Sequence, residues 1–234
     1  MSGSLALALP SKGRLMEAAQ LLFARAGLRV ERAGASRGYR GTLLGIDGIS
    51  VMFLSAGEIV TALQEGAADI GVTGEDLLSE ADTLHASPLE ILLKLGFGHA
   101  DVAVAIPECW FDVAAMADLD EISSEFYARH RRRLRVATKY MALTRRFFAE
   151  KGVTGYRIVE SSGATEGAPA LGSAEIIVDI TTTGSTLKAN HLKVLDDGII
   201  LKSEAVLAVR RHLAGDARAE ALLTRLAAHL RPCA

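Results

Sequence analysis

Residues 5–26 read LALALPSKGRLMEAAQLLFARA, and this stretch decides the fold class. The apolar run at residues 5–9 predicts a short buried strand, and Pro10 ends it. From Leu15 onward the apolar residues recur at helical spacing, so the chain passes from strand to helix within a few residues. The stretch therefore predicts a β-loop-α unit, which is the building block of α/β proteins.

Two similar units follow in the next fifty residues. Ile49–Leu54 is predicted to be a strand, and Ser55 with Glu58 forms a capping box at the start of the helix that Gly66 ends. Residues 69–73 predict a third strand, again followed by a helix. Three such units predict a mostly parallel sheet.

The alternation resumes after about residue 98, which separates a second lobe from the first. Further strands are predicted at residues 100–106, 134–137, 156–159 and 175–179. Helices are predicted at residues 140–151, near 164–171, from about 185 and at about 216–230, with an antiparallel pair turning at 196–198. We expect an α/β protein of two lobes with mostly parallel mixed sheets and flanking helices, in which residues 1–97 plus 183–234 form lobe I and residues 98–182 form lobe II.

Composition excludes several classes of function. The chain has 234 residues with 26 basic and 28 acidic side chains, so its net charge of −2 gives no global attraction for nucleic acid. The basic run at 129–135 is interpreted as a charged helix end, because no aromatic residues alternate with it. Cys109 and Cys233 have no CxxC spacing, and no two histidines lie three to five residues apart, so no zinc site is predicted. No segment approaches the ~20 apolar residues of a membrane span or the core of a signal peptide, and we expect a cytoplasmic protein without a membrane partner.

The stretch EIIVDITTTGSTL at residues 175–187 carries most of the chemical information. A buried strand delivers Asp179 to its carboxyl end, where open α/β sheets bind ligands, and small hydroxyl residues then lead into a helix. Backbone N–H groups at residues 183–186 can surround one anion, and Gly184 permits close approach. Asp179 can accept hydrogen bonds from two ribose hydroxyls, so the stretch predicts a ribose 5-phosphate site.

A purely structural interpretation of this stretch also remains open. Asp179 would then only end a strand, Thr183 or Ser185 would cap a helix, and Gly184 would ease a turn. Lys12 and Arg14 have the same alternative as solvated charges, although cations are unfavourable in a first helical turn unless an anion is near.

Further blocks connect this motif with a known family. ESSGATEGAP at residues 160–169, the strand and loop just described, and then Lys188–Asn190 resemble the signature of ATP phosphoribosyltransferases. Four more blocks resemble that family in the same order, namely LPSKGRL at 9–15, ASR at 35–37, GAADIGVTGED at 66–76 and RVATKY at 135–140.

The resemblance implies both a fold and a reaction. It implies two lobes like those of type II periplasmic binding proteins, with the active site between them. It implies that ATP and phosphoribosyl pyrophosphate give N1-(5-phosphoribosyl)-ATP and pyrophosphate with Mg²⁺, the first step of histidine biosynthesis. Because only residues 231–234 follow the last predicted helix, we expect the short form of the family, without a C-terminal regulatory domain. Its implied partners are a second copy of the chain and a regulatory subunit that resembles histidyl-tRNA synthetase.

Roles for individual residues follow from these positions. Predicted contacts to the donor phosphate and ribose are Glu160, Asp179, Thr182, Thr183, Gly184, Ser185 and Thr186. Predicted contacts to ATP or pyrophosphate are Lys12, Gly13, Arg14, Arg37 and Gly74, with Arg37 resembling the family's ATP-contacting arginine. Arg14, Arg37 and Asp179 are the candidate catalytic residues, because this reaction depends on positioning and on stabilising the leaving pyrophosphate. Glu160 and Glu166 can also orient magnesium-bound water, but the sequence identifies no magnesium ligands.

Two other functions fit parts of the pattern. A two-lobed solute-binding module would share the fold without catalysis. A phosphoribosyltransferase acting on a free nucleobase would share the phosphate loop, because that loop alone does not select the acceptor.

Overall fold

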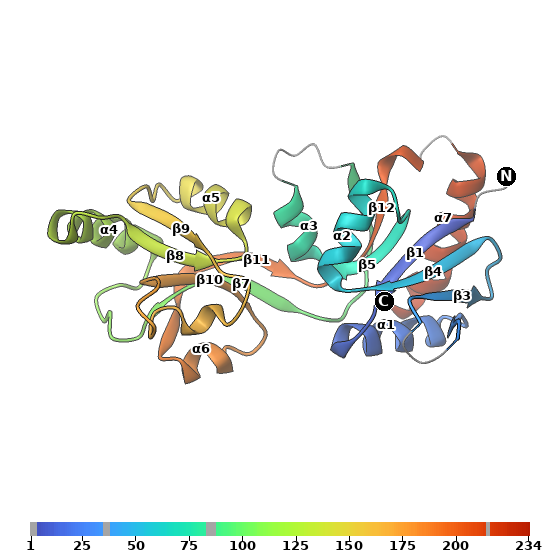
Figure 1. The fold of residues 1–234 in the computed structure, drawn as a ribbon, viewed down its shortest axis with the longest axis horizontal. Helices are drawn as coiled ribbons and strands as arrows, with labels where there is room; N and C mark the ends of the chain where they lie inside the picture. Colours follow the sequence, from blue (N-terminus) through green and yellow to red (C-terminus); the bar gives the residue numbers. More distant parts are fainter. Residues whose placement is uncertain (1–3, 35–37, 83–87, 214–215) are drawn as a thin grey trace. The chain divides into compact units, whose positions relative to one another are not determined.

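The computed structural model describes residues 4–34, 38–82, 88–213 and 216–234. They form two compact units (Figure 1), unit 1 with residues 1–99 and 204–234 and unit 2 with residues 100–203. No helix among the described residues is long and apolar enough to cross a membrane.

Unit 1 is built on a seven-stranded sheet with strand order β2-β3-β4-β1-β5-β12-β6. Its strands are β1 Leu5–Pro10, β2 Arg29–Arg32, β3 Arg40–Leu44, β4 Ile49–Leu54, β5 Ile70–Gly74, β6 Leu89–Lys94 and β12 Ala205–Arg210. The central strand β1 runs parallel to both β4 and β5, and the remaining neighbours pair antiparallel.

Helices cover both faces of this sheet. They are α1 Gly13–Arg25, α2 Ala56–Glu65, α3 Glu75–Ala81 and α7 Ala217–Leu230, with short 3-10 turns at Arg211–Leu213 and Arg231–Cys233. Alternate residues of β1 point to opposite faces. Leu7 packs with α1 and α7 in one core cluster, whereas Ala8 packs with α2 and α3 in the other. Unit 1 is therefore a three-layer α/β/α sandwich (Figure 1).

Unit 2 is built on a five-stranded sheet with strand order β11-β7-β10-β8-β9. Its strands are β7 Ala100–Pro107, β8 Leu134–Thr138, β9 Tyr156–Glu160, β10 Ile176–Thr181 and β11 Leu192–Ser203. Its helices are α4 Met116–His130, α5 Met141–Glu150 and α6 Ser185–Ala189, with a 3-10 turn at Thr165–Gly167. Strands β10, β8 and β9 run parallel, while β7 runs antiparallel to both of its neighbours. Figure 1 shows α5 and α6 on opposite sides of this sheet.

Several local predictions are confirmed. The Ser55 side chain accepts from the Glu58 N–H at 3.4 Å, and the Glu58 carboxylate accepts from the Ser55 N–H at 2.8 Å. Gly66 ends α2 in the left-handed conformation, with φ of 81°. The final helix also lies where periodicity predicts it, and Asp216 caps its first turn.

Three details of the prediction are wrong. The segment at 196–198 makes no hairpin turn, because β11 continues along β7 through register shifts over residues 192–203. Residues 183–203 consequently belong to unit 2 and not to lobe I. The helix expected at 164–171 is only a 3-10 turn at Thr165–Gly167.

Both sheets are mixed, as expected, although antiparallel pairs outnumber parallel pairs among the described strands. Parallel pairing is confined to β4-β1-β5 in unit 1 and to β10-β8-β9 in unit 2. The β-loop-α rule identified these central strands. It carries no signal for the antiparallel strands, whose neighbours in the sheet are set either by a direct return, as for β2 and β3, or by long-range pairing, as for β12.

Candidate active site

The carboxyl ends of three parallel strands meet at one edge of unit 2. Thr138, the last residue of β8, is aligned with Val178 of β10 and with Glu160 at the end of β9. Asp179 and the residues that follow it therefore lie beside the segments that follow β8 and β9. Such an edge is where open α/β sheets bind their ligands.

The predicted phosphate loop starts at this edge and is already ordered by its own hydroxyl groups. Gly184 adopts a φ of +71°, and a Cβ there would meet nothing within 4 Å. The Gly184 N–H donates to Thr181 Oγ1 at 2.9 Å, and the Thr183 hydroxyl donates to Ser185 Oγ at 2.9 Å. Helix α6 then begins at Ser185. The loop is therefore preformed. However, the N–H groups of Gly184 and Ser185, which were predicted to bind an anion, donate here to hydroxyl groups of the loop itself.

Asp179 has the environment of a functional carboxylate. It is half-buried, and its Oδ1 accepts from the Ile180 N–H at 2.8 Å. Burial raises its pKa above the ordinary value, Glu166 raises it further, and the Ile180 N–H and Lys139 oppose the increase. Because Lys139 and Glu166 act electrostatically on Asp179, three charged groups are brought together here from separate segments.

Glu160 and the loop after it complete this edge. Glu160 is exposed as the last residue of β9. Ser161 Oγ lies 3.0 Å from Thr165 Oγ1, and Thr165 is buried, so a hydroxyl pair fixes the loop that carries Glu166. The structure thus brings Glu160, Asp179 and the loop at 182–186 to one edge of a single sheet.

Unit 1 repeats this arrangement with different side chains. Strand β1 lies between its parallel neighbours β4 and β5, and the Ser11 N–H donates to the Leu54 carbonyl at 2.8 Å. Lys12, Gly13 and Arg14 follow at the exposed start of α1, whose first turn contains no acidic residue. Gly13 has a φ of +77°, which glycine tolerates and other residues rarely adopt.

Gly74 ends β5 at the same edge of unit 1. A Cβ at Gly74 would collide with the Asp76 carboxylate, so any other residue here would require that side chain to move. The acidic start of α3 is partly neutralised, because Lys94 Nζ lies 2.9 Å from Glu75 and 3.8 Å from Glu204. A contact from Gly74 to ATP or pyrophosphate stays a prediction.

Two cations near these edges lack a role in the sequence prediction. The Arg32 guanidinium stacks on Phe53 with its central carbon 3.9 Å from the ring centroid, and it donates to the Ser11 carbonyl at 3.0 Å. Arg32 therefore braces the loop that carries Lys12. Lys139 immediately follows β8. Its position directly after a predicted strand is the sequence signal that could have identified it as a candidate site residue. The predicted Arg37 lies outside the described residues.

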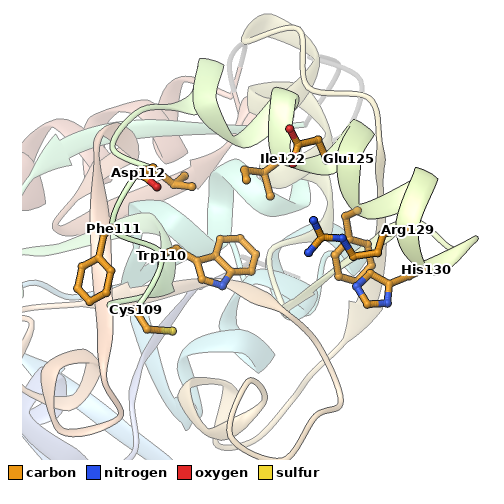
Figure 2. A pocket seen from close by; sticks show the side chains of 10 residues that line it. Cys109, Trp110, Phe111, Asp112, Ile122, Glu125, Arg129 and His130 are labelled. Carbon is orange, nitrogen blue, oxygen red and sulfur yellow. The ribbon is translucent and has the colours of Figure 1, made fainter.

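A cavity lies on another part of unit 2. Figure 2 shows Trp110 facing Arg129 and His130 of α4 across a cavity of about 370 Å³. This cavity opens beside the segment that follows β7, and β7 runs antiparallel to β10. It therefore lies at the opposite edge of the sheet from Asp179. The exposed basic end of α4 thus does have an aromatic neighbour, although none alternates with it in sequence.

The described residues contain no cluster of side chains that could bind a metal ion without further ligands. No group of three or more histidine, cysteine, aspartate or glutamate side chains is arranged there to hold an ion. A cation that reaches these edges would keep most of its ligands from water or substrate oxygens, which is the usual behaviour of Mg²⁺.

Comparison with known proteins identifies the family. The family model described as "HisG: ATP phosphoribosyltransferase" matches residues 55–229. The ATP phosphoribosyltransferase of Chelativorans sp. (strain BNC1) is 58% identical over 222 residues, covering 94% of this chain and 96% of that protein. Other curated relatives of the same name are 56–57% identical, and the chain spans only 65% of their length.

Two solved structures have the same fold. The ATP phosphoribosyl transferase (HisG:HisZ) complex from Thermotoga maritima includes a chain that is 26% identical, with a TM-score of 0.71 and 98% of both chains covered. The alkanesulfonate-binding protein SsuA from Xanthomonas axonopodis pv. citri is 14% identical, with a TM-score of 0.56, covering 98% of this chain and 72% of that protein, which supports the expected binding-protein-like fold alone. The family model and the near full-length relative together show that this chain belongs to the ATP phosphoribosyltransferase family.

Proposed function

We propose that the chain transfers a 5-phosphoribosyl group from phosphoribosyl pyrophosphate to N1 of ATP and releases pyrophosphate, as the first step of histidine biosynthesis. The observation that carries this assignment is the pairing of half-buried Asp179 with a preformed hydroxyl-rich loop at the end of the same strand. Family membership supports ATP as the acceptor.

We assign the ribose 5-phosphate of the donor to the edge of unit 2. The Thr182–Thr186 segment presents exposed hydroxyl groups and the start of a helix, both of which favour a phosphate. The Asp179 carboxylate accepts hydrogen bonds from the ribose hydroxyls, with Glu160 as a second acceptor. These contacts fix the sugar while positive charge develops at C1.

We assign ATP and the leaving pyrophosphate to cations at the edge of unit 1. Lys12 and Arg14 are exposed where no acidic side chain of the first helical turn competes for them. A guanidinium group binds phosphate oxygens in a bidentate manner, and its charge stabilises the leaving group more as negative charge develops there. Arg37 remains a proposed ATP contact on the basis of the resemblance alone.

Magnesium is the proposed cofactor. Glu160 and Glu166 would orient water molecules bound to this ion, and its direct ligands would be water and substrate oxygens. When bound, the ion neutralises charge on the pyrophosphate.

We further propose a short-form catalytic subunit that acts in the cytoplasm. It would form a homodimer and associate with a regulatory subunit resembling histidyl-tRNA synthetase. The neighbouring structure from Thermotoga maritima, described as a HisG:HisZ complex, supports an assembly of this kind. Light scattering of the purified chain tests the homodimer, and a strict monomer with full turnover would contradict it.

The activity is tested by pyrophosphate release. Purified chain with ATP, phosphoribosyl pyrophosphate and magnesium should release pyrophosphate, and omission of any one component should stop the release. Excess adenine should compete poorly with ATP. Efficient use of adenine would favour a nucleobase phosphoribosyltransferase, and binding of the donor without release would favour a solute-binding module.

A further inference from the structure

Lys139 occupies the middle of the catalytic edge proposed for unit 2. It follows β8, and β8 lies between β10, which carries Asp179, and β9, which ends at Glu160. Thr138 is in register with residues of both neighbours. Lys139 is therefore the next residue beyond the point where all three strands are aligned.

The backbone of Lys139 is held firmly while its side chain is free to reach solvent. Thr138 is fully buried and Tyr140 is 1% exposed, whereas Lys139 is exposed. The Tyr140 N–H donates to Thr138 Oγ1 at 2.9 Å, which closes a turn around Lys139. The ammonium nitrogen lies 4.9 Å from the centroid of the Tyr140 ring. The backbone at Lys139 is therefore held in place, while its ammonium group can contact a ligand in solvent.

The charge balance at this edge requires a cation. Asp179, Glu160 and Glu166 place carboxylates where a donor carrying several phosphate charges is proposed to bind. Carboxylates and phosphates that share one site repel each other unless a positive group offsets their charge. Lys139 already acts electrostatically on Asp179. Lys188 also belongs to this region, but it lies in the last turn of α6, where the helix dipole accounts for a cation.

Unit 1 shows the same arrangement independently. Its central parallel strand β1 is followed by Lys12 and Arg14 at the start of α1, and β8 is followed by Lys139, which directly precedes the N-cap residue Tyr140 of α5. Neither helix has an acidic residue in its first turn. Because a cation is unfavourable at a helix start, its presence in both units points to an anionic ligand at each edge.

We propose that Lys139 is a donor-binding residue whose ammonium group offsets the carboxylates of Asp179 and Glu166 and contacts phosphate oxygens of phosphoribosyl pyrophosphate. This inference rests on the proposed function, since it names a further residue of the same site.

Three variants test the role of Lys139. Lys139→Met removes the charge and keeps most of the side-chain length, and Lys139→Arg keeps the charge. Arg133→Met is the matched control, because it removes an exposed cation just before β8, at the other end of that strand. For each variant, KM for the donor and KM for ATP are measured by pyrophosphate release, and donor binding is measured by calorimetry.

The expected pattern is specific to the donor. Lys139→Met should raise the donor KM and Kd about tenfold or more, while the ATP KM changes less than about twofold. Lys139→Arg should restore most of the donor affinity, and Arg133→Met should match the parent. A donor Kd in Lys139→Met within about twofold of the parent would overturn the assignment, as would an equal loss in Arg133→Met.

The same experiments distinguish failure of the proposed function from failure of the Lys139 assignment. A parent chain that binds the donor but releases no pyrophosphate contradicts the transferase reaction, while the calorimetric comparison of the variants still decides the role of Lys139. A parent chain that does not bind the donor overturns both.

Discussion

Asp179 and Glu175 show how position within one short segment separates a functional carboxylate from a structural one. Burial raises the pKa of Asp179, and its neighbours only partly oppose that effect. Burial also acts to raise the pKa of Glu175, but hydrogen bonds from Arg135 and Arg132 outweigh it and hold that pKa at about 2. A carboxylate without full compensation is typical of a site that awaits a ligand.

Replacing Asp179 should separate stability from function. A raised folded-state pKa means that ionisation of Asp179 destabilises the fold, and stability is lost as pH rises through that value. Asp179→Asn should therefore leave the melting temperature near neutral pH unchanged or higher. It should weaken donor binding by about 1–3 kcal/mol, because two hydrogen bonds to ribose hydroxyls are compromised. Calorimetry with the donor and a thermal melt check the two halves, and a destabilised variant with normal donor affinity would assign Asp179 a structural role.

The Arg14→Ala variant tests the phosphate contact proposed for unit 1. It is exposed and has no hydrogen bond or ion pair to another described side chain, so Arg14→Ala should hardly change the melting temperature. Loss of a guanidinium contact to phosphate should lower kcat/KM by about tenfold to a hundredfold. Steady-state kinetics with both substrates measures this effect. A variant that melts earlier and turns over normally would support the solvated-charge alternative.

Among the helices and strands, the sequence predicts where the candidate site residues lie, because each of them is at or just after the end of a predicted strand. Asp179 with its loop, Glu160, and the Lys12 to Arg14 segment all follow strands that hydrophobic runs reveal. The path of β11 could not be predicted, because Asp196, Asp197 and Gly198 resemble a turn. They lie in the register shift between Val194 and Ile199, where long-range hydrogen bonds join Asp196 to Ala114 and Asp197 to Met116. Lys139 also follows a predicted strand, but the sequence alone does not show that β8 lies between β9 and β10 in the sheet.

The ion-pair cluster around Glu175 should stabilise unit 2 in a pH-dependent manner. Arg132 and Arg135 contact the Glu175 carboxylate at 3.0 and 2.6 Å. The lowered pKa means that this stabilisation is complete above the unfolded-state value of 4.5 and is lost as pH falls towards about 2. Glu175→Gln should therefore lower the free energy of unfolding by about 1–2 kcal/mol near neutral pH, because the cluster is partly screened by solvent.

Urea unfolding of the parent and Glu175→Gln at several pH values measures this difference. The gap between the two should shrink as the solution is acidified. A gap that stays constant down to the lowest pH tested would show that the hydrogen bonds do not depend on the charge of Glu175.

In the molecule as a whole, the proposed function uses one edge of each unit, and the Trp110 cavity lies away from the proposed edge of unit 2. Trp110 is the only tryptophan of the chain. Trp110→Phe should leave kcat and both KM values within about twofold of the parent, because an aromatic ring is kept and Asp179 is remote. A large loss of donor affinity in this variant would show that the cavity takes part in the reaction.

A crystal structure of the chain with phosphoribosyl pyrophosphate and magnesium would show directly where the donor binds. We expect the 5-phosphate to lie against the Thr182–Thr186 loop, the ribose hydroxyls to donate to Asp179, and Lys139 to reach the phosphate oxygens. A donor bound at any other place, with the loop empty, would contradict this expectation.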